Sequence, residues 1–268
     1  MHQALEYDRT PRWYGRRRRL WAALLLGTAA VVYNGWLLEF LLPTGLDPRH
    51  SYVSELYAAD QPFHRLFSGI EVACALLVTA GALLARCTPP GRLAAAGWWA
   101  AIAFAGCSVA DTVVPMRCAP SVERSCEAVN PWHTTTSALV HFAIFSSMAL
   151  LSAAAKAGGP RLPLIRRWGP WVLPCAMVCA VATVGPLFGG PGWHGIPQRA
   201  HLILVGTWFA LLAVELVRPL PDNQSATGNP TATHTPARSL QRRIGSDVSE
   251  GRSAVNGRTA RLRSRAGL

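Results

Sequence analysis

Residues 16–42 read RRRRLWAALLLGTAAVVYNGWLLEFLL, a block of four arginines followed by a long apolar run. A membrane-spanning helix needs roughly 20 mostly apolar residues, and the run from Leu20 to Leu42 is long enough. It is too long for the apolar core of a secretory signal peptide, and no clear small-residue cleavage site follows it. We therefore expect a first transmembrane helix that stays in the mature protein.

Five further apolar stretches follow this one. They cover residues 67–85, 93–114, 136–155, 169–188 and 200–217. Half of the residues are hydrophobic and only 15% are charged, and the apolar residues come in blocks rather than at the period of a water-facing core. Because lipid cannot satisfy backbone polar groups, each span should be a helix. The predicted fold is all-α: a polytopic membrane protein with a bundle of six transmembrane helices.

Prolines punctuate the fifth stretch. Pro170 and Pro174 suit the first turn of a helix, and Pro186 is expected to end or kink it.

Basic residues divide unevenly between the loops. All but five of the 26 Lys and Arg residues lie in the N-terminus, in the loops after spans two and four, or beyond span six. Basic residues remain on the cytoplasmic side of a membrane protein. This predicts a cell-membrane protein with both termini in the cytoplasm. The net charge of +12 follows the membrane edges, so no nucleic-acid partner is expected.

The composition also divides the chain into three parts. Residues 1–19 form a basic cytoplasmic N-terminus, residues 20–217 the six-helix transmembrane domain, and residues 218–268 a basic cytoplasmic tail. The tail is rich in Ser, Thr, Asn, Pro, Gly and Arg and lacks apolar periodicity, so we expect it to be disordered. Its arginines either contact anionic headgroups or are simply solvated.

Most carboxylates and histidines gather at the opposite, outward side of the predicted bundle. A charge inside the hydrocarbon costs roughly 2.5–3.5 kcal/mol even on a mild scale, so Glu71 and His141 need partners. We expect them to share an outward-facing cavity with Asp111 and with Arg199, the natural counter-charge for Asp111 or Glu71. The alternative is that each polar side chain reaches the headgroups separately.

The loop after span one contains a Ser-Glu pair within residues 50–63, which is typical of a short interfacial helix. Ser51 is the expected N-cap, and Ser54 and Glu55 either serve the cavity or only cap the helix. The predicted cavity residues are Ser54, Glu55, Glu71, Asp111, His141, Arg199 and His201.

Histidines from different spans raise the question of a metal. His133, Ser137 and His141 share one face if span four begins near Pro131. However, neither an HExxH motif nor a paired-cysteine zinc motif occurs, so we expect no metal and no cofactor.

Cys118 and Cys126 lie in the second outward loop. An oxidising compartment allows a disulfide to form there, and we expect one between these two residues. The other cysteines should pack as small apolar side chains.

Several segments together resemble a known family. They are Tyr52-Val53-Ser54-Glu55-Leu56 with Pro62, Asp111 with Pro115, Cys118-Ala119-Pro120 with Cys126, His141, and Gly195-Ile196-Pro197-Gln198-Arg199. This set is similar to the uncharacterised six-span bacterial membrane family called domain of unknown function 998. The resemblance covers roughly residues 20–217 and implies an integral membrane protein without an established activity.

A weaker similarity is to multi-span hydrolases that place Ser, Asp and His around zinc. Ser54, Asp111, His141 and His201 would play those parts, but the usual histidine spacing on the last span is missing.

Three functions remain open. The first is a membrane protein whose outward cavity binds a lipid headgroup or a small solute. The second is an intramembrane metal-dependent hydrolase with Glu55 or Glu71 as base, and the third is a structural or partner-binding subunit. Whether the chain is an enzyme stays undecided, and the lipid bilayer is the expected partner.

Overall fold

The computed structural model describes residues 12–86, 91–123, 125–126, 131–158, 162–185 and 192–218. Its regular elements are all helical, as predicted. The α-helices are α1 (Arg12–Val32), α2 (His64–Ala85), α3 (Arg92–Val113), α4 (Pro131–Lys156), α5 (Pro163–Ala182) and α6 (Gly195–Val217). Two short 3-10 helices, η2 (Gly35–Phe40) and η3 (Val53–Tyr57), lie between α1 and α2. The predicted disordered tail falls almost entirely on residues 219–268, which lie outside the described residues.

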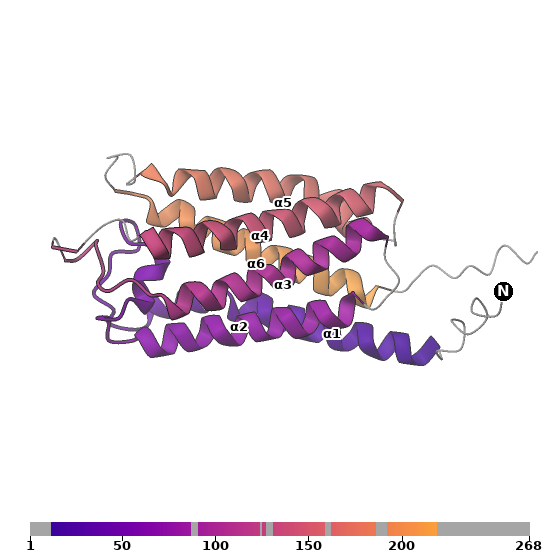
Figure 1. Cartoon of the computed structure of the whole chain (residues 1–268), viewed down its shortest axis with the longest axis horizontal. Coiled ribbons are helices and arrows are strands. Elements are labelled where there is room, and N and C mark those ends of the chain that lie inside the picture. The colour runs from indigo at the N-terminus through magenta and orange to yellow at the C-terminus, as the bar shows by residue number, and fades with distance from the viewer. Residues whose placement is uncertain are drawn as a thin grey trace, which may run out of the picture. The chain divides into compact units, whose positions relative to one another are not determined.

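The helices form a closed ring in which each one packs against the next in sequence and α6 returns to α1. They lie side by side along the bundle, and successive helices alternate in direction (Figure 1). One end of the bundle therefore carries η2, η3 and the loop between α3 and α4. We call it the disulfide end, and the other the opposite end.

The interior of the ring is apolar and aromatic. Tyr33, Phe104 and Phe209 contact one another with ring centroids 5.6–5.9 Å apart, at edge-on or tilted angles that aromatic rings prefer. By contrast, large apolar side chains such as Val31 and Phe142 are exposed on the outside. Apolar side chains facing outward are what a lipid-facing surface requires.

Five helices are long and apolar enough to cross a membrane, namely all but α5. The predicted fifth span, residues 169–188, is displaced, because α5 begins at Pro163 and includes Arg166 and Arg167. Glu215 of α6 explains the early start. Its carboxylate accepts hydrogen bonds from the N–H groups of Leu164 (2.7 Å) and Ile165 (3.0 Å), which have no partner within the helix.

Pro170 and Pro174 consequently lie inside α5, and their predicted place in its first turn is wrong. Pro163 takes the first helical position instead, where its missing N–H costs nothing.

The first span changes its winding near the disulfide end. The α-helix ends at Val32, and the 3-10 helix η2 continues the span from Gly35 to Phe40. Asn34 contributes to the change, because its side-chain Nδ2 donates to the Ala30 carbonyl at 2.9 Å. The tighter winding buries Trp36 and Glu39, which places Glu39 inside the bundle.

Candidate functional site

The predicted disulfide between Cys118 and Cys126 is present, with Cα atoms 5.9 Å apart. The loop that it closes packs against the loop between α1 and α2. The Met116 carbonyl accepts a hydrogen bond from the Ala59 N–H at 2.9 Å, and the Ser54 hydroxyl contacts the Met116 sulfur at 3.8 Å. The two loops thus form one layer over the disulfide end.

Glu55 joins these two loops. Its buried carboxylate accepts hydrogen bonds from the Tyr52 N–H (2.8 Å), the Ser121 N–H (3.0 Å) and the Ser121 hydroxyl (2.5 Å). These contacts satisfy both oxygens, so Glu55 acts as a cap and a tie between loops. Tyr52 occupies the N-cap position of η3, and the predicted capping role of Ser51 is wrong. The Ser51 hydroxyl instead donates to the Asp47 carbonyl.

The same loop docks onto α5 and α6. The Tyr52 hydroxyl donates to the Thr183 carbonyl at 2.9 Å, and the Val53 N–H donates to Oε1 of Gln198 at 2.6 Å. Burial and the nearby Glu55 raise the pKa of Tyr52 to about 12, so its hydroxyl stays a donor. The ring centroids of His194 and Tyr52 lie 4.2 Å apart, and burial lowers the pKa of His194.

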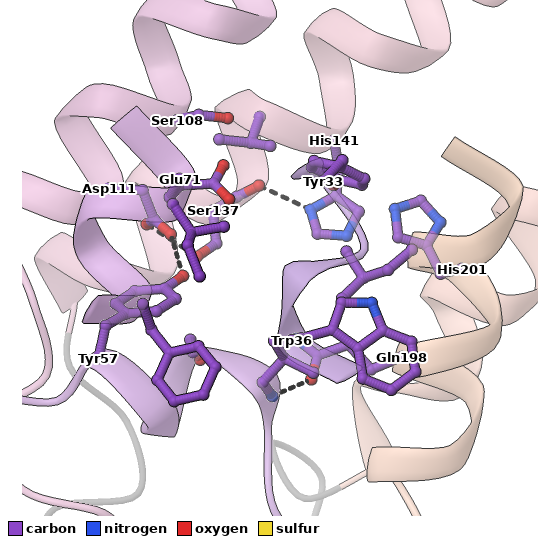
Figure 2. A pocket seen from close by; sticks show the side chains of 16 residues that line it. Tyr33, Trp36, Tyr57, Glu71, Ser108, Asp111, Ser137, His141, Gln198 and His201 are labelled. Atoms are coloured by element: carbon purple, nitrogen blue, oxygen red, sulfur yellow. Dashed lines mark hydrogen bonds between the residues drawn. The ribbon is translucent and has the colours of Figure 1, made fainter. Parts of the chain in front are cut away.

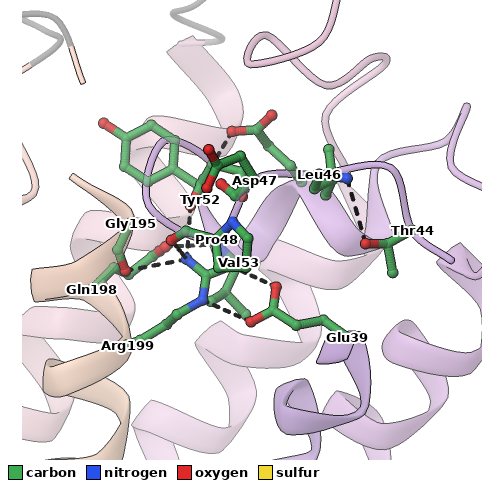
Figure 3. A network of polar contacts seen from close by, with 12 residues as sticks. Glu39, Thr44, Leu46, Asp47, Pro48, Tyr52, Val53, Gly195, Gln198 and Arg199 are labelled. Carbon is green, nitrogen blue, oxygen red and sulfur yellow. Dashed lines mark hydrogen bonds and ion pairs between the residues drawn. The ribbon is translucent and has the colours of Figure 1, made fainter. Parts of the chain in front are cut away.

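Arg199 lies at the centre of a second polar cluster, which we call the Arg199 knot (Figure 3). Its Nε and Nη2 donate to the two oxygens of Glu39 at 2.7 and 2.6 Å. Its Nη1 donates to the carbonyls of Pro48 (2.7 Å), Ser51 (2.9 Å) and Gly195 (3.1 Å). Both charged side chains are buried, so this is a fully hydrogen-bonded internal ion pair.

This geometry overturns the predicted counter-charge role of Arg199. The guanidinium pairs with Glu39 rather than with Asp111 or Glu71. The reason is the 3-10 winding of η2, which turns Glu39 inward beside the start of α6. Gly195 allows the close approach, because a Cβ there would lie 2.2 Å from the Pro48 carbonyl oxygen.

A polar cavity of about 110 Å³ lies deeper in the bundle, between η2, η3, α2, α3, α4 and α6 (Figure 2). We call it the polar pocket. Of the predicted site residues, Ser54, Glu71, Asp111, His141 and His201 line it. Glu55 and Arg199 do not: one is held by Tyr52 and Ser121, the other by the knot.

Asp111 is surrounded by donors. Its Oδ1 accepts hydrogen bonds from the Thr136 hydroxyl and from the Ser137 hydroxyl, the latter at 2.9 Å. Nδ1 of His133 lies 3.2 Å from the same oxygen, and the Tyr57 hydroxyl donates to Oδ2 at 3.3 Å. Four side chains from η3 and α4 thus hold one carboxylate of α3, which compensates for its burial.

His141 and His201 stack across the pocket with ring centroids 4.8 Å apart. Nδ1 of His141 lies 2.7 Å from the Ser137 carbonyl, and Nδ1 of His201 lies 3.0 Å from the Ala176 carbonyl. A carbonyl only accepts, so each Nδ1 carries a hydrogen. In the neutral rings Nε2 is then an acceptor.

Glu71 differs from Asp111, the other carboxylate on the pocket wall, which has His133 beside it. Among the described residues Glu71 forms no ion pair, although it lies inside α2. Ser108 lies beside it in the pocket (Figure 2), and the buried Ser108 hydroxyl has no partner of normal hydrogen-bond geometry in the described chain. The indole Nε1 of Trp36, also on the pocket wall, is likewise buried without a described partner.

A second, larger cavity of about 390 Å³ adjoins the polar pocket, and we call it the apolar cavity. It lies mainly between α4 and α5, with Ala138, Phe145, Ala180 and Val181 on its walls. Both cavities share four wall residues, namely Ser54, Ser137, His141 and Gln198. A polar compartment therefore borders an apolar one.

The donors do not form a metal site. Over the described ranges, no group of three or more His, Cys, Asp or Glu side chains is arranged to hold a metal ion. His141 and His201 each have one ring nitrogen at a backbone carbonyl, and Asp111 is held by hydroxyls and His133. The described residues therefore give the zinc hydrolase analogy no support.

Sequence reasoning did not find several residues of this region. Glu39, the partner of Arg199, lies with Tyr33 and Trp36 in an apolar run that gives no sign of a pocket. Gln198 had a usable signal, because it directly precedes Arg199 in one of the segments that carry the family resemblance.

Comparisons with known proteins bear on the whole chain. No curated protein and no solved structure matches it. A family model described as "Protein of unknown function (DUF998)" matches residues 25–215, from within α1 almost to the end of α6. This match covers most of the chain and all the elements that build the two cavities. The chain therefore belongs to the DUF998 family of proteins of unknown function.

Proposed function

We propose that this protein binds an amphiphilic molecule from the outer half of the cell membrane. The polar end of the ligand, a lipid headgroup or a small solute, enters the polar pocket, and its hydrocarbon part lies in the apolar cavity. The observation that carries this proposal is the shared wall: Ser54, Ser137, His141 and Gln198 line both compartments. Ligand sites are commonly apolar cavities with a few converging polar groups.

The size of the two compartments fits this division. A water molecule takes up roughly 30 Å³ in the liquid, so about 110 Å³ holds a small polar group but not a large headgroup. The apolar cavity, at about 390 Å³, is in the range of small-molecule sites.

The orientation that we propose places the disulfide end outside. The opposite end carries Arg16 to Arg19, Arg86, Arg92, Lys156, Arg166, Arg167 and Arg218. Basic residues favour the cytoplasmic side, and a disulfide persists in an oxidising compartment. Both arguments give the same direction, with the chain termini in the cytoplasm.

We also propose that α5 is a sixth span. Its 20 residues amount to about 30 Å of helix, roughly the thickness of the hydrocarbon core. It packs against α4 and α6 within the ring, and its arginines fall in its first two turns, where long side chains reach the headgroups.

A labelling experiment tests the orientation. Asp60→Cys lies in an exposed outer loop and Lys156→Cys at the exposed opposite end. A membrane-impermeant maleimide added to intact cells should label the first variant and not the second, above the background of the native chain. Labelling of Lys156→Cys alone would reverse the orientation.

Filling the apolar cavity tests the binding. Ala138→Trp places a large ring on its wall, whereas Leu139→Trp, one residue further, changes a half-exposed side chain outside the wall. Mass spectrometry of purified protein should find an amphiphile retained by the native chain and by Leu139→Trp, and lost from Ala138→Trp. Equal retention by both variants would contradict the proposal.

A further inference from the structure

We infer that the polar group taken up by the pocket is a cation, a primary ammonium group attached to the hydrocarbon tail. This inference rests on the binding proposed above and names the ligand class. It follows from the charges on the wall, from the one wall carboxylate without an ion pair among the described residues, and from the hydrogen-bond acceptors on the wall.

The described walls of both cavities contain no Lys or Arg. The nearest arginine of the outer half, Arg199, donates to Glu39 and to three backbone carbonyls. An anionic group such as a phosphate would therefore face Glu71 and Asp111 without a basic partner. Like charges in a desolvated site repel strongly, so the pocket disfavours anions.

Glu71 is the carboxylate that binds the cation in this proposal. Asp111 already accepts hydrogen bonds from Thr136, Ser137 and Tyr57 and lies beside His133, whereas Glu71 forms no ion pair in the described chain. A carboxylate inside a membrane needs a partner or must give up its charge. An ammonium group in the pocket provides that partner.

The remaining wall atoms suit the three N–H bonds of an ammonium group. The buried Ser108 hydroxyl, which lies beside Glu71, can accept one of them. Nε2 of His141 and of His201 are acceptors because Nδ1 of each ring faces a carbonyl. The tail then leaves past His141 and Ser137, the residues that lead into the apolar cavity.

A photo-crosslinking experiment tests this with the full chain in phosphatidylglycerol nanodiscs, which contain no amine lipid. Three probes carry the same diazirine-bearing tail: dodecylammonium, dodecanol and dodecanoate. The ammonium probe should label the α4 and α5 segments around Ala138 and Val181, and unlabelled dodecylammonium should compete. Dodecanoate should not label these segments, and dodecanol should label them about tenfold less.

Two matched variants separate charge from folding. Glu71→Gln should lower ammonium labelling about tenfold, and Glu71→Asp, which keeps the charge, should retain more labelling than Glu71→Gln. Glu123→Gln makes the same chemical change at an exposed carboxylate of the outer loop and should have no effect. The comparison of probes on the native chain remains valid even if a variant fails to fold.

Competitors distinguish the source of the amine. Competition by ethanolamine indicates that a free amine suffices, and competition by unlabelled dodecylammonium alone indicates that the amine must carry a hydrocarbon tail. Dodecanol labelling as strong as that of dodecylammonium, or failure of unlabelled dodecylammonium to compete, overturns the ammonium inference while amphiphile binding stands. Absence of labelling by all three probes overturns the proposed function as well.

Discussion

The Arg199 knot and the polar pocket each contain a carboxylate inside the bundle, but they differ in whether that carboxylate has a charged partner. In the knot, the guanidinium of Arg199 binds the carboxylate of Glu39 in a bidentate ion pair. Its Nη1 also donates to three backbone carbonyls. In the pocket, Glu71 has no ion pair in the described chain and lies beside a cavity of about 110 Å³. Arg199 was the expected counter-charge for Asp111 or Glu71, and it pairs with Glu39 instead.

This difference teaches which of the two carboxylates is structural. A buried ion pair with all its hydrogen bonds made holds two segments in one arrangement, and removal of one partner leaves an uncompensated charge. A carboxylate beside a cavity contributes little to folding and can be neutralised at small cost. Stability should therefore depend on the knot, and ligand binding on the pocket.

The largest effect should come from breaking the knot. Arg199→Met leaves Glu39 buried and uncompensated, and we expect a loss of about 3–5 kcal/mol of unfolding free energy. Thermal unfolding of the purified protein measures it. The double variant Glu39→Met with Arg199→Met should recover most of this loss, since no charge is left behind. If the single variant unfolds like the native chain, the knot is not structural.

Removing the disulfide should have the next largest effect. Replacing Cys118 and Cys126 by Ser frees a loop with a sequence separation of 8, which should cost about 2–3 kcal/mol through the entropy of the unfolded chain. Reduction of the native protein should lower its unfolding temperature similarly. An unfolding temperature that does not respond to reduction would show that the loop contacts alone hold this layer.

Breaking the tie between the two loops at the disulfide end should cost somewhat less. Ser121→Ala removes the hydroxyl donor to Glu55 and leaves the backbone donors, so about 1.5–3 kcal/mol is expected for this charged acceptor. Ser125→Ala, which loses only a contact to the exposed Glu123, serves as control. Equal unfolding temperatures for both variants would refute the structural role of Glu55.

Glu71→Gln tests whether the carboxylate of the polar pocket contributes to stability. Because no ion pair is lost, we expect a change in unfolding free energy within about 0.5 kcal/mol, or a slight gain from neutralising a buried charge. The same variant should lose ligand labelling. A loss of stability as large as that of Arg199→Met would mean that Glu71 is structural and that the pocket has no separate role.

The smallest effect should come from the exposed pair of Asp47 and Arg49. Hydrogen bonds from Arg49 lower the pKa of Asp47 to about 2. Because folding lowers the pKa of this carboxyl, its pair with Arg49 stabilises the folded protein at pH values above the ordinary pKa of aspartate. This stabilisation is lost as the pH falls through about 2. Solvent screens such a pair, so Asp47→Asn should leave the unfolding temperature at pH 7 unchanged. A clear drop in the unfolding temperature would show that the pair supports the loop whose Pro48 and Ser51 carbonyls bind Arg199.

Much of this molecule was predictable because the lipid environment restricts its structure. Apolar blocks in a membrane must be helices, so the all-α bundle and the approximate positions of its helices follow from composition. The disulfide was predictable for a similar reason, since two cysteines close together in one loop have few other partners. In contrast, the start of α5 depends on Glu215, which is 50 residues away from Ile165, and no local pattern contains that contact.

The sequence by itself determined that most carboxylates and histidines lie toward one end of an apolar bundle and most basic residues toward the other, because an unpaired charge in hydrocarbon is costly. Only the tertiary structure decided how those residues pair. Glu39 reaches Arg199 because η2 winds as a 3-10 helix, and Glu71 is left beside a cavity because Arg199 is already bound. Pairing depends on side-chain directions and on distances of a few ångströms between helices far apart in the chain, and these are properties of packing that residue spacing does not encode.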